Sequence, residues 1–129
     1  MAFSLKIQES SLENSSDYKN DKGNHECVVL VQKTAGVPNT GKWSKGIKVM
    51  DAAAGVIKVG TVIATFDIDG KYPTDRRHAA LYESHDKSGI NVIDQWNKQG
   101  KALRRKIGLK KDKTRNVNDA DWYYVVETN

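Results

Sequence analysis

The sequence predicts an α+β fold in which N-terminal helices pack on a small antiparallel β-sheet. Two observations support this fold class. A helix-like stretch at residues 25–35 is followed by a glycine and a proline, and from residue 58 onward short β-branched runs alternate with turn sequences. A chain of 129 residues is the size of one domain. We therefore expect a single domain over residues 1–129, with a polar arm at residues 1–20 and a core at about residues 23–127.

The predicted helix lies in the sequence HECVVLVQKTA, residues 25–35. Asn24 is the expected N-cap, and the acidic Glu26 falls in the first turn, where the helix dipole favours it. Gly36 and Pro38 are typical of a helix end. The run VVLV is also compatible with a buried strand, and the start and stop residues decide for the helix.

The sheet is predicted from four stretches that follow. A turn-rich connection, PNTGKWSKG, and a short helix or irregular segment, IKVMDAAAG, precede it. Residues 60–66 give the first strand, and residues 77–96 give two strands around the turn HDKSG. KALRRKI and DWYYVVE give the last two strands, separated by a basic loop.

The hairpin within residues 77–96 makes a geometric prediction. A turn centred on Asp86 sets Tyr82 opposite Ile90 and His78 opposite Asp94. Opposed residues share one face of the sheet, with Cβ atoms about 5 Å apart. The Asp94 carboxylate could then orient the His78 imidazole, although a turn shifted by one residue would spoil the match.

The only cysteine, Cys27, has two interpretations. Cysteine is often a small packing residue in a core. At the N-terminus of a helix, however, the dipole and the free amide groups stabilise a thiolate and can hold an oxyanion. Amide hydrolysis needs a thiolate, an imidazole and a group that orients the imidazole, and Cys27, His78 and Asp94 have these side chains.

A zinc site is the alternative use of these side chains. His25, Cys27, His78 and His85 could surround the ion, but their spacing matches no zinc signature. We therefore expect neither a metal nor another cofactor.

Composition indicates the compartment in which we expect the chain to be made and to fold. Hydrophobic residues make up 38% of it, enough for a modest core, and one cysteine excludes an internal disulfide. No run approaches the roughly 18 apolar residues of a membrane span, and the first residues lack the features of a signal peptide. We expect synthesis in the cytoplasm without a signal peptide, no membrane insertion, and export only by a machine that needs no such signal.

The net charge of +5 is concentrated near the C-terminus. Residues 101–115, KALRRKIGLKKDKTR, hold eight Lys or Arg against one Asp. Such a segment suits nucleic acid, anionic lipid or the bacterial wall, or it is a solvated strand and loop. A binding module without catalysis is therefore an alternative function. Nucleic acid is the less favoured ligand, because no known motif is present and the aromatic residues are not interleaved with the basic ones.

Several stretches, in order, resemble papain-like amidases of the CHAP and NlpC type. They are HECVVLVQ, VGTVIATF, RHAALY, VIDQW and KALRRKI, and together they cover about residues 23–107. Among these amidases, the chain is most similar to small bacterial proteins related to type VI secretion amidase effectors. The resemblance implies a papain-like core and a peptidoglycan amidase that needs no cofactor.

The same resemblance implies roles for individual residues. Cys27 would be the nucleophile, His78 the general base and acid, and Asp94 the orienting residue. Arg77 replaces the glycine that usually precedes the histidine, and could dock a substrate carboxylate or crowd the cleft. An upstream tyrosine, here Tyr18, would lie near the oxyanion.

The remaining expectations concern neighbours and partners. Trp43 and Trp96 could form the floor of a substrate groove or pack in the core. Gln95 should point to the face opposite Asp94, away from the chemistry. The resemblance implies peptidoglycan as substrate, delivery by a secretion system and a cognate immunity protein that plugs the cleft around Cys27. A degenerate amidase that only binds the wall remains an intermediate possibility.

Overall fold

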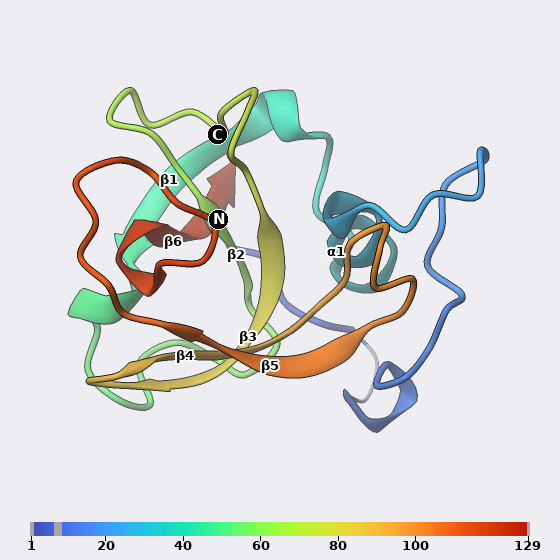
Figure 1. Cartoon of the computed structure of the whole chain (residues 1–129), viewed down its shortest axis with the longest axis horizontal. Coiled ribbons are helices and arrows are strands. Elements are labelled where there is room, and N and C mark those ends of the chain that lie inside the picture. Colours follow the sequence, from blue (N-terminus) through green and yellow to red (C-terminus); the bar gives the residue numbers. More distant parts are fainter. Residues whose placement is uncertain (1, 7–8, 129) are drawn as a thin grey trace.

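A computed structural model describes residues 2–6 and 9–128 of the chain. One α-helix, α1, packs on a strongly curved six-stranded sheet in which every pairing of neighbouring strands is antiparallel and whose strand order is β1-β6-β2-β3-β4-β5 (Figure 1). The elements are α1 (Cys27–Ala35), β1 (Trp43–Lys48), β2 (Val62–Thr65), β3 (Ala79–Asp86), β4 (Gly89–Asp94), β5 (Leu103–Gly108) and β6 (Tyr123–Thr128). Short 3₁₀ turns lie at Glu9–Ser11, Thr40–Lys42, Val49–Asp51 and Ala120–Trp122.

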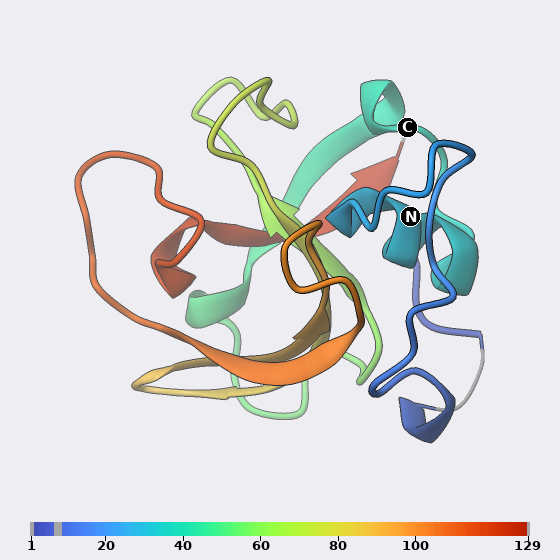
Figure 2. The ribbon, with the colours of Figure 1, turned by 45° about the vertical axis from the view of Figure 1, so that its right-hand side comes forward.

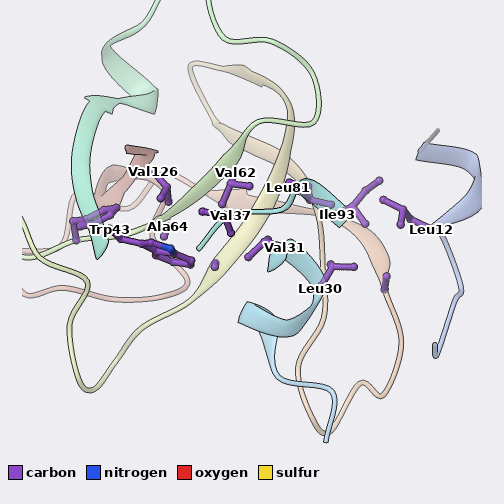
Figure 3. Packing of buried hydrophobic residues seen from close by; sticks show 14 residues of the cluster. Leu12, Leu30, Val31, Val37, Trp43, Val62, Ala64, Leu81, Ile93 and Val126 are labelled. Atoms are coloured by element: carbon purple, nitrogen blue, oxygen red, sulfur yellow. The ribbon is translucent and has the colours of Figure 1, made fainter. Parts of the chain in front are cut away.

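The two faces of the sheet bury separate apolar clusters. One cluster fills the space between α1 and the sheet (Figure 3) and is formed mainly by Leu12, Leu30, Val31, Val37, Trp43, Val62, Ala64, Leu81, Ile93 and Val126. The other covers the opposite face and includes Ile63, Ala80, Tyr82, Ile90, Val92, Ile107, Tyr123 and Val125. Residues adjacent in a strand therefore divide between the two clusters, as the two-residue period of a strand requires.

The N-terminal segment first runs beside the sheet, where Ala2 and Ser4 form isolated bridges with Glu127 and Thr61. The chain up to residue 26 then passes around the outer side of α1 (Figure 2). Leu12 is fully buried in the cluster under the helix. The backbone of Asn14 donates to the carbonyl of Ala102, and the backbone of Ala102 donates to that of Ser15. Part of the predicted polar arm is thus docked on the segment that leads into β5.

The helix begins two residues later than predicted. Glu26 is the N-cap, with an extended backbone and no side-chain capping bond, so Cys27 is the first helical residue. Asn24 does not cap the helix, because its backbone N–H belongs to a preceding turn and donates to the Asn20 side chain. Gly36 ends the helix as predicted, in the left-handed conformation at φ 71° that glycine adopts without strain.

The expectation of several N-terminal helices is wrong for the described residues. Only α1 is an α-helix there, and the other helical pieces are three-residue 3₁₀ turns. Part of the predicted turn-rich region is instead the edge strand β1, which pairs with β6. Its sequence, WSKGIK, gave no strand signal, because Lys and Gly interrupt the apolar alternation. At Gly46 a Cβ atom would lie 2.6 Å from the Val125 carbonyl oxygen, which explains the glycine in the strand.

The β3–β4 hairpin has a different register from the predicted one. Tyr82 pairs with Val92 and not with Ile90, and an irregularity follows Tyr82. The offset at this pair is two residues, so every side chain before the irregularity keeps its predicted face. His78 and Asp94 therefore approach each other diagonally instead of directly across the hairpin.

The basic loop between β5 and β6 folds around one buried carboxylate. Asp119 accepts hydrogen bonds from the backbone N–H groups of Lys110 (2.8 Å), Asp112 (2.7 Å), Asp121 (3.1 Å) and Lys111 (3.3 Å). Burial alone would raise the pKa of Asp119, but these bonds lower it below its ordinary value. The loop is thus held together by its single buried acid.

We expect Asp119→Ala to lower the free energy of unfolding by about 2–4 kcal/mol at neutral pH, because each buried donor left unpaired costs about 1–3 kcal/mol. Since the pKa of Asp119 is lowered by folding, its stabilisation is complete above the unfolded-state value of about 3.9 and is lost as the pH falls through the folded-state value. Denaturant unfolding at neutral and acidic pH should show the difference shrinking in acid. The control, Asp21→Ala, removes an exposed carboxylate and should change stability by less than about 0.5 kcal/mol. Equal stability of the Asp119 variant and wild type at neutral pH would contradict this account.

Candidate active site

A cleft of about 380 Å³ opens at the N-terminal end of α1, between the segments that precede β3 and follow β4. It is lined by Glu26, Cys27, Val28, Gln32, Asn39, Thr40, Tyr72, Arg77, His78, Trp96 and Asn97. Cys27 and His78 thus face one hollow, although 50 residues separate them in sequence.

Cys27 is held at the cleft by the anchoring of the helix start. The Gln95 side chain, fully buried, donates from Nε2 to the carbonyl oxygens of Glu26 (3.0 Å) and Tyr18 (2.7 Å). Gln95 follows β4 on the face opposite Asp94, so it contacts the backbone at the helix start and not the imidazole. Cys27 itself is partly exposed, and the first amide groups of the helix have no intrahelical acceptor.

His78 is fixed at the start of β3 by the end of β2. Its backbone N–H donates to Thr65 Oγ1 (3.0 Å), and its carbonyl accepts from the backbone N–H of Thr65 (3.0 Å). These bonds form because β2 and β3 are paired at this point. The imidazole is buried, with 7% of the residue exposed, and it closes one side of the cleft.

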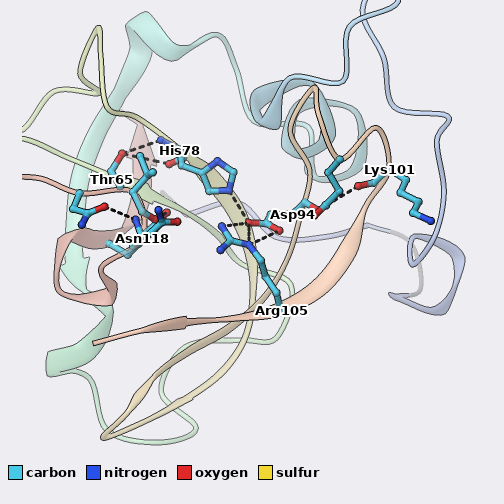
Figure 4. Close-up of polar contacts among 10 residues, drawn as sticks. Thr65, His78, Asp94, Lys101, Arg105 and Asn118 are labelled. Atoms are coloured by element: carbon cyan, nitrogen blue, oxygen red, sulfur yellow. Dashed lines mark hydrogen bonds and ion pairs between the residues drawn. The ribbon is translucent and has the colours of Figure 1, made fainter. Parts of the chain in front are cut away.

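The imidazole is held in turn by a buried ion-pair network (Figure 4). His78 Nε2 lies 2.7 Å from Asp94 Oδ2. The same carboxylate accepts from Arg105 Nε (2.8 Å to Oδ2 and 3.1 Å to Oδ1) and lies 2.7 Å from Arg105 Nη2. Since Asp94 occupies Nε2, the other ring nitrogen, Nδ1, is left for the thiol.

Arg105 is a site residue that the sequence analysis missed. It belongs to the basic segment assigned there to surface charge. In the sheet, however, Arg105 pairs with Val92 and Leu103 pairs with Asp94, so Arg105 lies diagonally next to Asp94 on the same face. The signal that could have found it was the two-residue period of the β4–β5 pairing.

The electrostatics of the cleft favour a charged sulfur and imidazole. Burial alone would raise the pKa of Cys27, but the hydrogen bond and charge of His78, the Ala79 backbone N–H and the Tyr72 hydroxyl lower it. Burial would lower the pKa of His78, but Asp94 and Cys27 raise it to about 9. The pKa of Asp94 is lowered despite burial by His78 and Arg105. The arrangement can therefore hold a thiolate–imidazolium pair beside a carboxylate near neutral pH.

Two of the accessory residues named from the sequence line the cleft. Trp96 is 37% exposed and lies edge-on to His78 at 6.4 Å between ring centroids. The Arg105 guanidinium lies over the Trp96 ring at 5.0 Å. Arg77 places its guanidinium over the Tyr72 ring at 5.5 Å and makes no ion pair with any described residue. Arg77 is thus available for an anionic ligand.

The other two accessory residues lie elsewhere. Trp43 is 4% exposed, packs in the core under α1 and donates from Nε1 to the Pro38 carbonyl (2.8 Å). It borders a neighbouring hollow and not the cleft that contains Cys27. The side chain of Tyr18 packs against the same core outside the cleft. Neither is placed to contact a carbonyl bound at Cys27.

The histidines of the zinc hypothesis are dispersed. His25 Nε2 lies 2.8 Å from the Ser16 carbonyl oxygen. His85 bonds through its two ring nitrogens to the Tyr82 hydroxyl and the Ala52 carbonyl, both at 2.7 Å. Among residues 2–6 and 9–128, no group of three or more His, Cys, Asp and Glu side chains is arranged to hold a metal ion. Nor does any helix in those ranges have the length and apolar character to cross a membrane.

Much of the basic segment is used inside the molecule. Arg104 pairs with Glu13 and Glu83, and Lys106 pairs with Asp86. Arg115, 5% exposed at its side chain, bridges Asp67 (2.6 Å) and Asp75 (2.8 Å), and so ties the β5–β6 loop to the segment before His78. With Arg105 on Asp94, four of the eight basic side chains have internal acidic partners. Fewer cations than the sequence suggests are therefore free to bind a polyanion.

Comparisons with known proteins agree on one group. Residues 2–126 match the family described as "Domesticated amidase effector 2". The chain is 36% identical over 116 residues to the type VI secretion amidase effector 2 protein of Salmonella typhi, covering 80% of this chain and 85% of that one. It is 39% identical over 106 residues to domesticated amidase effector 2 of Ixodes scapularis, covering 79% and 70%. A solved structure of type 6 secretion amidase effector 2 (Tae2) superposes with a TM-score of 0.80 at 30% identity, covering 97% and 94%, and confirms the predicted α+β, papain-like fold class.

Proposed function

Because the chain belongs to the domesticated amidase effector 2 family, we propose that it is a cysteine amidase that hydrolyses an amide bond in the peptide part of peptidoglycan. The observation that carries this proposal is the cleft in which Cys27, at the start of α1, meets the imidazole of His78, itself held by Asp94 at 2.7 Å. A nucleophile, a base and an orienting group in this order are the requirements of covalent amide hydrolysis.

In the first half of the reaction, the Cys27 thiolate attacks the carbonyl carbon of the amide. The new S–C bond forms as the electron pair of the C=O π bond moves to the oxygen. When this adduct collapses, the C–N bond breaks, and the His78 imidazolium gives its proton to the departing nitrogen. The products are a thioester on Cys27 and a free amine.

In the second half, water releases the acyl group. Neutral His78 takes a proton from the water, whose oxygen adds to the thioester carbonyl. The C–S bond then breaks, giving a carboxylic acid and the Cys27 thiolate beside the His78 imidazolium. Asp94 stabilises the imidazolium and fixes the ring orientation through both halves.

The cleft suits a peptide that carries carboxylates. Arg77 offers a guanidinium at its rim, and Trp96 offers a partly exposed aromatic face. Peptidoglycan stem peptides are rich in free carboxyl groups and short enough to enter an open cleft. The names of the relatives, which call them amidase effectors, support the same substrate class.

The likeness to a type VI secretion effector supports a setting as well as an activity. Delivery by a secretion system would take the protein to the wall of a target cell. A producing cell would then need a cognate immunity protein, and the simplest inhibitor would insert into the cleft around Cys27.

Digestion of purified peptidoglycan sacculi tests the proposed function. The wild-type protein should release fragments that carry one new amino group and one new carboxyl group per cut, identified by mass spectrometry. The bond is named by the fragment masses. Binding of the wall without release of any fragment, across wall types that differ in stem peptide, would favour the binding-module alternative.

The pH dependence of hydrolysis should be bell-shaped. Activity should rise with pH as Cys27 ionises, below the ordinary thiol value of about 8.5, because folding lowers that pKa. It should fall around pH 9 as the imidazolium of His78 loses the proton needed by the leaving amine. Alkylation by iodoacetamide, which needs only the thiolate of the single cysteine, should rise on the same acidic limb without falling at high pH. Hydrolysis that keeps rising well above pH 9 would contradict the assignment of His78 as general acid.

A further inference from the structure

Tyr72 lines the cleft that contains Cys27 and His78. The residue lies between β2 and β3, in the stretch KYPTDRR, which shows no helix or strand periodicity. Its hydroxyl oxygen is buried, and no residue in the described part of the chain lies in hydrogen-bonding geometry to it. A buried donor without a partner costs about 1–3 kcal/mol, so an unpaired hydroxyl at this place needs an explanation.

The ring of Tyr72 is held rigidly. Its centroid lies 4.7 Å from that of Trp43 in a tilted arrangement and 6.3 Å from that of Phe66, edge-on. The Arg77 guanidinium covers the ring at 5.5 Å. Each contact between two aromatic rings contributes about 0.5–1.5 kcal/mol beyond the burial of the rings. The packing therefore fixes the direction of the hydroxyl without any help from a hydrogen bond.

The Tyr72 side chain and Cys27 line the same cleft. The two groups lie near enough to affect each other's pKa. The Tyr72 hydroxyl lowers the pKa of the Cys27 thiol. Burial, and to a smaller extent the Cys27 sulfur, raises the pKa of the Tyr72 hydroxyl well above its ordinary value. Tyr72 therefore keeps its proton throughout the working pH range and can act there as a hydrogen-bond donor. A carbonyl carbon attacked by Cys27 would bring its oxygen to this part of the cleft.

We propose that Tyr72 is a catalytic residue of the proposed amidase, whose hydroxyl donates a hydrogen bond to the oxygen of the scissile carbonyl as that oxygen takes up negative charge. The proposal rests on the function proposed above and adds the oxyanion donor to it. As the S–C bond forms, the π electron pair moves to the oxygen and the O–H···O⁻ bond shortens. When the C–N bond breaks, the C=O bond re-forms and the hydroxyl keeps its proton.

Tyr72 would supply the oxyanion hydrogen bond that was expected from Tyr18. Tyr18 was the tyrosine named from the sequence for the oxyanion, but its side chain does not line the cleft. The backbone N–H groups at the start of α1 supply the other donors, since Glu26 gives them no side-chain cap. Tyr72 and the helix start would then approach the oxygen from different walls of the cleft.

Tyr72→Phe tests the proposal, because it removes one oxygen and leaves the ring packing in place. Loss of one oxyanion donor typically lowers kcat by about 10²- to 10³-fold, and we expect this with little change in KM. Thermal stability should be unchanged or slightly higher, since the substitution removes no hydrogen bond between described residues. Tyr124→Phe is the matched control: Tyr124 packs edge-on against Phe66 at 6.3 Å outside the cleft, and its variant should retain wild-type kcat.

Two reactions separate an oxyanion role from a ground-state effect on the thiol. Acylation of Cys27 by p-nitrophenyl acetate passes through an oxyanion and needs no peptidoglycan, so its rate should fall in Tyr72→Phe. Alkylation by iodoacetamide has no oxyanion and should change by no more than a few fold. If both rates fall in parallel, or if neither falls, the proposal is overturned. Absence of peptidoglycan cleavage by the wild type would overturn the proposed substrate and leave the acylation test decisive for Tyr72.

Discussion

Cys27→Ala should abolish peptidoglycan cleavage, with a loss of at least about 10³-fold in kcat. Removal of a nucleophile leaves only the residual acceleration that binding and oxyanion donors provide. Cys27→Ser should be nearly as inactive, although it differs by one atom. A serine hydroxyl is a far weaker acid than a thiol, and a cleft that stabilises a thiolate by hydrogen bonds and one imidazolium does not ionise it. The measurement is product release from sacculi by mass spectrometry.

The trapped intermediate gives a second readout for Cys27. An acylating substrate should add its acyl mass to the wild-type protein at the peptide that contains Cys27, and to neither variant. Both variants should keep the wild-type melting temperature to within a few degrees, because the side chain is small and partly exposed. A Cys27→Ala protein that is folded and still cleaves peptidoglycan would remove the cysteine mechanism and leave the family fold intact.

Local sequence patterns were sufficient for the helix and for the sides of the hairpin. Gly36 ends α1 where predicted, and the face of each side chain in the first part of the β3–β4 pairing is right although the register is not. The reason is parity: the observed pairing of Tyr82 with Val92 differs from the predicted one by two residues, and two is the period of a strand. An error of one residue would have separated His78 from Asp94.

Contacts that depend on how the strands pair and pack were not predicted from the local sequence patterns. In the sequence, Arg105 does not differ from the other cations of the basic run. Only the pairing of β5 with β4 places it next to Asp94. β1 is a strand because β6 offers it a partner, not because its own residues favour one. Tyr72 lies in a segment without periodicity, so its place beside Cys27 follows from the packing of its ring on Trp43 and Phe66.

These contacts also explain why the basic segment suggested a different function. The sequence left two interpretations of the charge at residues 101–115 open, affinity for a polyanion or a solvated strand and loop. Arg105 instead keeps a buried carboxylate ionised, and Arg115 anchors the segment that leads into His78 through Asp67 and Asp75. A charged side chain in a strand has two faces available to it, and composition alone does not tell which one it takes.

The second large effect is expected for Asp94→Asn, which should lower kcat by about 10²- to 10⁴-fold. The amide keeps the shape of the side chain, but it no longer stabilises the imidazolium or favours the tautomer that faces the thiol. Because Asp94 helps to raise the pKa of His78, its loss should also move the basic limb of the pH profile to lower pH. The shift of this limb, measured on the folded variant, distinguishes an orienting and charge-stabilising role from a general loss of structure.

Asp86→Asn provides the matched control for this substitution. Asp86 is an exposed carboxylate at the end of β3, paired with Lys106 and outside the cleft, so its variant should keep the wild-type pH profile and stability. Asp94→Asn should in contrast be less stable by about 3–5 kcal/mol, because it leaves Arg105 partly buried beside a neutral group. If Asp94→Asn retains wild-type kcat and an unmoved basic limb while losing this stability, Asp94 serves Arg105 and the fold, and another group orients His78.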